Sequence, residues 1–286
     1  MITAETVRQF GFKPKKRLGQ HFLVAEEVVE RILFAAELGP EDIIVEVGPG
    51  LGMLTRKLAE HANKVIAVEL DSKLVSMLRK RLSSLSNVKI IHGDILKVAP
   101  RQLLEDVIAS KAKQAQLAPS YKVVANLPYY ITSPVLRHFL EAQLQPSMMV
   151  VMVQKEVGEA IAATSGKMSL LSVRTQFYSK PSIISYVPAK GFYPPPKVDS
   201  LVLRLDVYSK PPIEVSDFAG FFDIVIRGFS SPRKQLRNSL AQSLGMPPSE
   251  VALLLEKAKI QATRRAETLS LEEWKRLWKL FAPFKK

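Results

Sequence analysis

The residues best suited to chemistry lie in Asn126-Leu-Pro-Tyr129, directly after an apolar run. An exocyclic amine such as adenine N6 is a poor nucleophile because its lone pair is delocalised into the ring. We expect the Asn126 side chain and the Leu127 carbonyl to accept the two hydrogens of such an amine, which favours a pyramidal, more reactive nitrogen. Tyr129 offers a ring on which an extracted base can stack. The alternative is an ordinary strand-to-helix turn in which Asn126 is only a cap.

Two acids and a glycine-rich turn accompany this segment. Gly48-Pro-Gly-Leu-Gly52 follows the apolar run 43–47, and its glycines allow a ligand to approach the backbone closely. Glu69 ends the next apolar run, where a carboxylate can accept hydrogen bonds from ribose hydroxyls, and Asp94 follows the third run, where it can meet an adenine amine. A dinucleotide fingerprint would need glycine in place of Met53. Together these features predict a nucleoside pocket; the alternatives are a tight turn and surface carboxylates.

The elements that must position these residues alternate between apolar strands and helical stretches. Parallel strands joined by helices form a doubly wound sheet, whose ligands bind at the carboxyl ends of the strands. We therefore expect an α/β fold with a Rossmann-like sheet. The expected strands are residues 43–47, 64–69, 88–91, 121–125, 148–153, 182–187 and 198–207.

A second, smaller domain is expected after the linker Ser209-Lys-Pro-Pro212. No strand pattern follows it, and helices are expected near residues 216–229, 232–243, 248–258 and 270–281. We predict a catalytic domain over residues 1–208, with a basic N-terminal arm, and an all-helical domain over residues 209–286. Its basic residues could grip folded RNA by its phosphates, unless the domain is only a structural cap. The candidates are Arg233, Lys234 and Arg237, which we place on one helix, and Arg264 and Arg265.

Composition narrows the function classes. Lys and Arg outnumber Asp and Glu by 41 to 27, a net charge of +14, which favours a polyanionic partner such as nucleic acid. The chain has no cysteine, so a disulfide framework, a thiolate metal site and a Cys nucleophile are excluded, and with four scattered histidines we expect no metal. There is no signal-like or membrane-length apolar run, so we expect a cytoplasmic protein.

Eight short segments, in order, resemble the small-subunit ribosomal RNA adenine N6-dimethyltransferases, a family of enzymes that use S-adenosylmethionine (SAM). The resemblance covers nearly the whole chain. The segments are Arg17-Leu-Gly-Gln-His-Phe-Leu23, Glu46-Val-Gly-Pro-Gly-Leu-Gly52, Ala67-Val-Glu-Leu-Asp71, Gly93-Asp94, Asn126-Leu-Pro-Tyr129, Phe192-Tyr-Pro-Pro-Pro-Lys-Val-Asp-Ser200, Arg233-Lys-Gln-Leu-Arg-Asn-Ser239 and Arg264-Arg-Ala-Glu-Thr-Leu-Ser270.

The resemblance also implies residue roles. Tyr129 and Phe192 would stack on the target adenine, while Leu70 and Ile95 would sandwich the base of the cofactor. The family usually has Asn where this chain has His21, so contact through that side chain is in question, although the backbone could still serve. The residues implied to contact SAM are His21, Leu23, Gly48, Glu69, Asp94 and Asn126.

The function implied is the transfer of methyl groups from SAM to N6 of two adjacent adenines near the 3′ end of small-subunit ribosomal RNA, leaving S-adenosylhomocysteine (SAH). The expected substrate is RNA in a pre-30S particle, bound by a monomer during ribosome biogenesis, without a metal or a membrane. One alternative is the related methylation of a large-subunit adenine, as in macrolide resistance. Another is a non-catalytic assembly or RNA-binding factor on the same fold.

Overall fold

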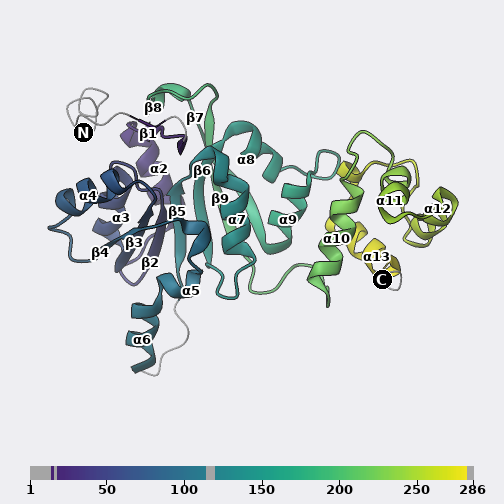
Figure 1. Cartoon of the computed structure of the whole chain (residues 1–286), viewed down its shortest axis with the longest axis horizontal. Helices are drawn as coiled ribbons and strands as arrows, with labels where there is room; N and C mark the ends of the chain where they lie inside the picture. Colours follow the sequence, from purple (N-terminus) through teal and green to yellow (C-terminus); the bar gives the residue numbers. More distant parts are fainter. Residues whose placement is uncertain (1–13, 16–17, 114–119, 282–286) are drawn as a thin grey trace. The chain divides into compact units, whose positions relative to one another are not determined.

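The computed structural model describes residues 14–15, 18–113 and 120–281. The chain divides into two compact units (Figure 1). The first unit comprises Met1–Gly158 and Lys180–Val207, and the second comprises Glu159–Ser179 and Tyr208–Lys286. One crossing between the units, at Val207–Tyr208, lies beside the predicted boundary between residues 208 and 209. The sequence did not indicate that residues 159–179 group with the helical unit, and the functional division into two domains stays a prediction.

The first unit is built around a seven-stranded sheet with the strand order β4-β3-β2-β5-β6-β9-β7. A short two-stranded sheet joins β1 to β8 in antiparallel register. The strands are β1 Phe22–Leu23, β2 Ile43–Val47, β3 Lys64–Glu69, β4 Val88–His92, β5 Lys122–Asn126, β6 Met148–Gln154, β7 Ser179–Val187, β8 Phe192–Tyr193 and β9 Ser200–Val207.

The sheet is parallel from β4 to β6, and β9 runs antiparallel to β6. All five residues of β2 are buried, because this central strand is covered on both faces. The order reverses between β2 and β5, whose carboxyl ends therefore open beside a crevice suited to a ligand. This arrangement confirms the predicted Rossmann-like α/β fold.

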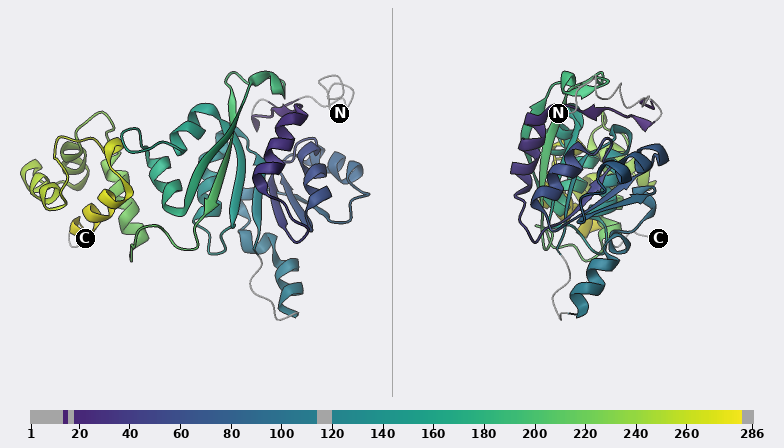
Figure 2. Two further views of the ribbon diagram at one scale, coloured as in Figure 1. Left: turned by 180° about the vertical axis from the view of Figure 1, so that it is seen from behind. Right: turned by 90° about the vertical axis from the view of Figure 1, so that its left-hand side faces the viewer.

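Helices cover both faces of this sheet, with α2 and α7 on opposite sides (Figures 1 and 2). Asp71 begins α4 by accepting a hydrogen bond from the Lys73 backbone N–H, as an N-terminal cap should. The helices around the sheet are α2 Glu26–Ala36, α3 Met53–His61, α4 Ser72–Arg81, α5 Pro100–Leu103, α6 Glu105–Lys113, α7 Thr132–Leu140 and α8 Lys155–Ile161, with 3-10 turns η2 Ile95–Lys97, η3 Tyr129–Ile131 and η4 Ala189–Gly191.

The second unit is helical. Ser270 and Glu273 form a capping box at the start of α13, with the Ser270 N–H bonded to Glu273 Oε2 and the Glu273 N–H to Ser270 Oγ. Its helices are α9 Leu170–Tyr178, α10 Phe218–Gly228, α11 Leu236–Leu244, α12 Pro248–Lys257 and α13 Leu271–Phe281, with the 3-10 turn η5 Ala266–Thr268.

Aromatic packing explains why α9 belongs to the helical unit. The Phe177 ring of α9 lies 5.3, 5.1 and 5.2 Å from the rings of Phe218, Phe221 and Phe222 of α10. The pairs with Phe218 and Phe222 are edge-to-face, a favourable geometry for aromatic rings that bury apolar surface. At the other end of α10, Gly228 allows α13 to approach, because a Cβ there would lie 2.4 Å from the Trp274 ring.

One detail of the helical unit differs from the expectation. Helix α11 begins only at Leu236, so Arg233 and Lys234 precede it and do not share a helix with Arg237. Its first N–H, at Leu236, is bonded to the Arg264 carbonyl, which stands in for the missing helical turn.

Within the described part of the chain, no helix combines the length and the apolar character needed to cross a membrane. Most of the basic arm, including Arg8 and Lys13, lies outside the described residues.

Candidate active site

A cavity opens at the carboxyl ends of β2, β3 and β5, beneath the arm that precedes α2. It brings together residues more than one hundred positions apart in the chain. Of the residues that the sequence proposed for cofactor and base, His21, Leu23, Gly48, Glu69, Leu70, Asp94, Ile95, Asn126, Leu127 and Tyr129 line it.

The glycine-rich turn wraps one wall of the cavity. Gly48, Gly50 and Gly52 have φ angles of 66°, 57° and 79°, a left-handed conformation that L side chains rarely adopt. The Gly50 N–H and the Asp71 N–H donate to the two carboxylate oxygens of Glu69, at 3.4 and 2.8 Å. The turn therefore holds the Glu69 carboxylate in one orientation at the end of β3.

The Glu69 carboxylate is nearly inaccessible to solvent. Burial raises its pKa, and the charge of Asp71 adds to that, whereas the backbone N–H groups of Asp71 and Gly50 oppose the rise. A carboxylate held by two N–H donors keeps lone pairs for further donors, as ribose hydroxyls would require.

Asp71 fastens the arm over the cavity. Its Oδ2 atom forms an ion pair with Lys15 Nζ at 2.8 Å and accepts from Gln20 Nε2 at 3.3 Å, while Gln20 Oε1 accepts from the Lys15 N–H. Burial alone would raise the pKa of Asp71, but the contacts with Lys15, Lys73 and Gln20 lower it overall. The same residue thus caps α4, supports Glu69 and holds Lys15 and Gln20 of the arm. The segment Ala67–Asp71 was noted in the sequence, but this role of Asp71 was not.

Asn126 is the last residue of β5 and reaches the arm. Its Nδ2 atom donates to the His21 carbonyl at 3.3 Å, which leaves the Oδ1 atom as the acceptor of the amide of a residue that lines the cavity. The next N–H, at Leu127, donates to the Met152 carbonyl at 3.1 Å and fixes the peptide that follows. The predicted pair of acceptors, Asn126 and the Leu127 carbonyl, therefore lies on a rigid strand end.

The His21 ring contributes where an Asn was expected. It stacks on Tyr129 with ring centroids 5.8 Å apart and an interplanar angle of 21°. Its Nδ1 atom donates to the Pro194 carbonyl at 2.7 Å, and the Tyr129 hydroxyl is 2.6 Å from Ser200 Oγ. The Tyr129 ring is thereby held at its edge and on one face. Tyr130, which the sequence analysis did not single out, also lines the cavity and is 53% exposed.

Phe192 does not line the cavity in the described structure. It is 3% exposed and packs in the core with Leu23, its partner across the β1–β8 pair, and Val28. Tyr193, the next residue, is partly exposed because side chains alternate between the faces of a strand. The stacking role of Phe192 stays a prediction, and it would require the ring to leave this core.

The family model for ribosomal RNA adenine dimethylase matches residues 11–282. The chain belongs to this family.

Named relatives agree with the family. Ribosomal RNA small subunit methyltransferase A from Dehalococcoides mccartyi is 47% identical over 273 residues, which are 96% of this chain and 90% of that protein. The protein of the same name from Moorella thermoacetica is 43% identical over 274 residues, which are 95% and 94% of the two chains.

Solved structures are similar over most of the chain. A dimethyladenosine transferase from Plasmodium falciparum has a TM-score of 0.75 at 25% identity, covering 92% of this chain and 98% of that one. The 23S rRNA methyltransferase ErmE has a TM-score of 0.69 at 27% identity, covering 91% and 99%. The protein is therefore a SAM-dependent methyltransferase of the ribosomal RNA adenine dimethylase family.

The basic residues expected to bind RNA lie in the second unit, and they differ in how exposed their side chains are and in what they contact. Arg233 and Lys234 are exposed, and Arg237 is half-buried. Lys234 Nζ lies 2.9 Å from Gln242 Oε1 of α11, an exposed contact that RNA could replace. Arg265 has a side chain that is 54% exposed and only a long 4.0 Å contact with Glu267.

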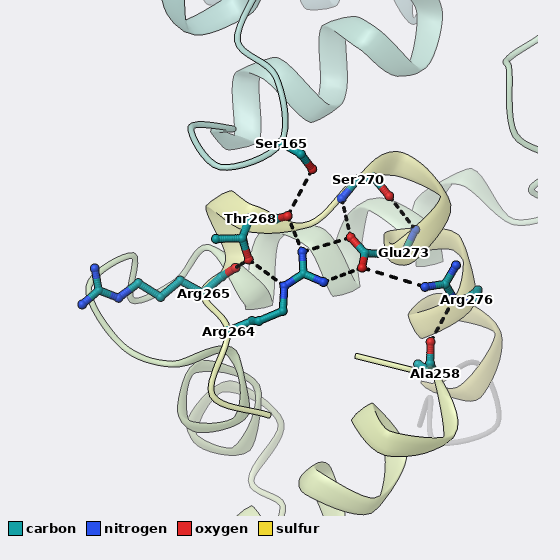
Figure 3. Close-up of polar contacts among 8 residues, drawn as sticks. All are labelled: Ser165, Ala258, Arg264, Arg265, Thr268, Ser270, Glu273 and Arg276. Carbon is teal, nitrogen blue, oxygen red and sulfur yellow. Dashed lines mark hydrogen bonds and ion pairs between the residues drawn. The ribbon is translucent and has the colours of Figure 1, made fainter. Parts of the chain in front are cut away.

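Arg264 is instead engaged within the protein (Figure 3). Its guanidinium forms a forked pair with the Glu273 carboxylate, and it also donates to the Thr268 hydroxyl at 3.0 Å and to the Thr268 carbonyl. Burial alone would raise the pKa of Glu273, but the bond to Arg264 and the Ser270 N–H lower it overall. Phosphate binding by Arg264 stays a prediction, while the structure gives it a bracing role between η5 and α13.

The described residues contain no group of three or more side chains suited to hold a metal ion.

Proposed function

We propose that this protein transfers methyl groups from SAM to N6 of two adjacent adenines in the 3′-terminal hairpin of small-subunit ribosomal RNA, giving N6,N6-dimethyladenine. We further propose that it acts as a cytoplasmic monomer on a pre-30S particle. The observation that carries the proposal is the Asn126 amide, which lines the cavity and donates through Nδ2 to the His21 carbonyl, so that Oδ1 is the acceptor we propose for the base.

The cavity suits SAM by the chemistry of its lining. Three acids, Glu46, Glu69 and Asp94, line it, and no Lys or Arg does so among the described residues, which favours a ligand with net positive charge. Glu69 would accept from the ribose hydroxyls and Asp94 from the adenine amine. Leu70 is 46% exposed although apolar, and Ile95 is buried, so these two would cover the faces of the adenine.

The backbone and the arm would hold the rest of the cofactor. Gly48 leaves room for close approach, and His21 and Leu23 would contact it from the arm. When bound, SAM supplies a methyl group on a positively charged sulfur. Asn126 Oδ1 and the Leu127 carbonyl would accept the N6 hydrogens, draw the lone pair out of the ring and aim it at the methyl. The methyl group would pass to N6, the sulfur would keep the electron pair of the broken carbon–sulfur bond, and the N6 proton would leave to solvent.

A second transfer is compatible with this pocket. After the first methylation N6 has one hydrogen left, and either acceptor suffices for it. Tyr129, held by His21 and Ser200, would stack on the extracted adenine and replace part of its former stacking. The base is most easily extracted from a hairpin loop.

The relatives named for the small subunit support the choice of RNA, whereas the likeness to a 23S rRNA enzyme keeps the large subunit as the second candidate. The test is methyl transfer from labelled SAM to small and large subunits isolated without this modification, followed by mapping of the nucleotide. We expect label only in the small subunit, as dimethyladenine at two adjacent positions. Label in the large subunit would support the second candidate, and no transfer to either would contradict the proposal.

A further inference from the structure

One buried acid in the cavity has no part in the proposed reaction. Glu46 lies in β2, two residues before the glycine-rich turn, and is 1% exposed. Its Oε2 atom has no hydrogen-bond partner among the described residues. An ionised carboxylate buried in this way costs free energy unless a positive charge is close.

The described residues that line the cavity around Glu46 offer no such charge. Glu69, at the end of the adjacent strand β3, is the charged group that acts on it, and its sign is also negative. Asp94, His21 and Tyr130 also line this cavity. None of its described lining residues is a Lys or an Arg. Burial is the main cause that raises the pKa of Glu46 to about 8, and the negative charge of Glu69 raises it further. The Thr55 hydroxyl opposes this shift.

We propose that Glu46 is a charge-selecting residue: it is neutral in the free enzyme, ionises when SAM brings its sulfonium charge into the cavity, and regains a proton when neutral sulfur remains after transfer. This inference rests on the proposed function, because it requires SAM in this cavity.

The charges of the two ligands make the selection possible. At neutral pH the amino-acid parts of SAM and SAH each carry one ammonium and one carboxylate, so the sulfonium is the charge that distinguishes them. An opposite charge close to a buried carboxyl favours its ionised form. SAM would therefore gain a buried partner that SAH does not have, and the proton released on SAM binding would return from solvent after transfer. The enzyme would bind its methyl donor in preference to its own product.

The test is isothermal titration of the free protein with SAM and, separately, with SAH. Working between about pH 6 and about pH 7 keeps the ligand ammonium protonated. Repeating each titration in two buffers of different ionisation enthalpy counts the protons released. For SAM we expect close to one proton released and an affinity that rises about tenfold per pH unit. For SAH we expect little release and a nearly constant affinity.

Three variants test which residue releases the proton when SAM binds. Glu46→Gln should still bind SAM but should lose the release and the pH dependence, so its preference for SAM over SAH should shrink. Glu69→Gln should bind both ligands more weakly and keep the release. Glu60→Gln, an exposed change on α3, is the matched control and should behave as the wild type does. Circular dichroism checks that each variant is folded.

The outcomes separate this inference from the proposed function. If SAM does not bind at any pH, the proposed function fails. If SAM binds without releasing a proton, or if Glu46→Gln keeps the release, the assignment to Glu46 is wrong. Equal release with SAH would place the ionisation opposite the amino-acid part of the ligand and would overturn the charge selection.

Discussion

At the scale of single residues, Asn126 and Glu46 line the same cavity but have different proposed roles. Asn126 must stay neutral and fixed, and its bond to the His21 carbonyl fixes it. Glu46 is buried, and its Oε2 atom has no partner among the described residues. The role of Asn126 is therefore tested by the rate of methyl transfer, and the role of Glu46 by the pH at which its carboxyl group ionises.

Replacing Asn126 by Ala should remove most of the methyl transfer at saturating SAM. The deleted acceptor acts on the reacting nitrogen, and one such interaction is worth about a hundredfold or more in rate. RNA affinity should change little, because phosphate contacts dominate it. Single-turnover rates with labelled SAM and filter binding of the RNA measure the two effects; a rate near that of the wild type would remove Asn126 from the mechanism.

Replacing Glu46 by Gln should stabilise the free protein at alkaline pH. With its pKa raised from 4.5 to about 8, the folded chain holds a proton that the unfolded chain releases. This contribution to stability is complete below about pH 4.5 and is lost as the pH rises through about 8, at about 1.4 kcal/mol per pH unit for one proton. The variant, which does not titrate there, should gain relative to the wild type across that range.

Urea unfolding followed by circular dichroism at about pH 5, 6.5 and 8 measures this difference. Both tryptophans, Trp274 and Trp278, are buried in the second unit, so their fluorescence reports that unit separately and serves as an internal control. Parallel stability curves for wild type and variant would show that Glu46 does not titrate in this range.

At the scale of elements, neighbouring arginines have different surroundings. Arg264 braces η5 against α13, whereas the Arg265 side chain is 54% exposed (Figure 3). The Arg264 carbonyl also accepts from the first N–H of α11. A partly buried forked pair contributes far more than an exposed contact, because an unpaired partner left behind is poorly solvated.

We therefore expect Arg264→Gln and Arg265→Gln to fail in different ways. Arg264→Gln should lower the free energy of unfolding of the helical unit by about 1–3 kcal/mol, as read by Trp fluorescence in urea. Arg265→Gln should leave that stability within about 0.5 kcal/mol of the wild type and weaken RNA binding instead. Equal stability in the two variants would contradict the bracing role.

At the scale of the whole molecule, a net charge of +14 predicts that RNA affinity depends steeply on salt. Reversing Arg233, Lys234 and Arg237 to Glu should flatten the dependence of log affinity on log salt by about 0.7–0.9 for each phosphate that the protein no longer neutralises. The matched control reverses the exposed residues Lys80, Lys97 and Arg101, which changes the net charge equally. If both triple variants change the slope equally, net charge and not this cluster governs binding.

The sequence by itself determined the sheet, the glycine-rich turn and the ends of the strands that carry Glu69, Asp94 and Asn126. Short apolar runs and glycine spacing are local signals. Parallel strands place their carboxyl ends at one edge of the sheet, so the position of the cavity could be predicted from the order of the strands along the chain. The strands and the family are confirmed; the roles of the cavity residues stay predictions.

Only the tertiary structure decided which side chains already have partners within the protein or are buried in its core. Arg264 and Arg265 are adjacent and identical in type, yet one is paired with Glu273 and the other is exposed. Phe192 lies in the core, and Glu46 is isolated among acids. Pairing and burial depend on residues far away in the chain, which meet only after packing, so no local pattern encodes them.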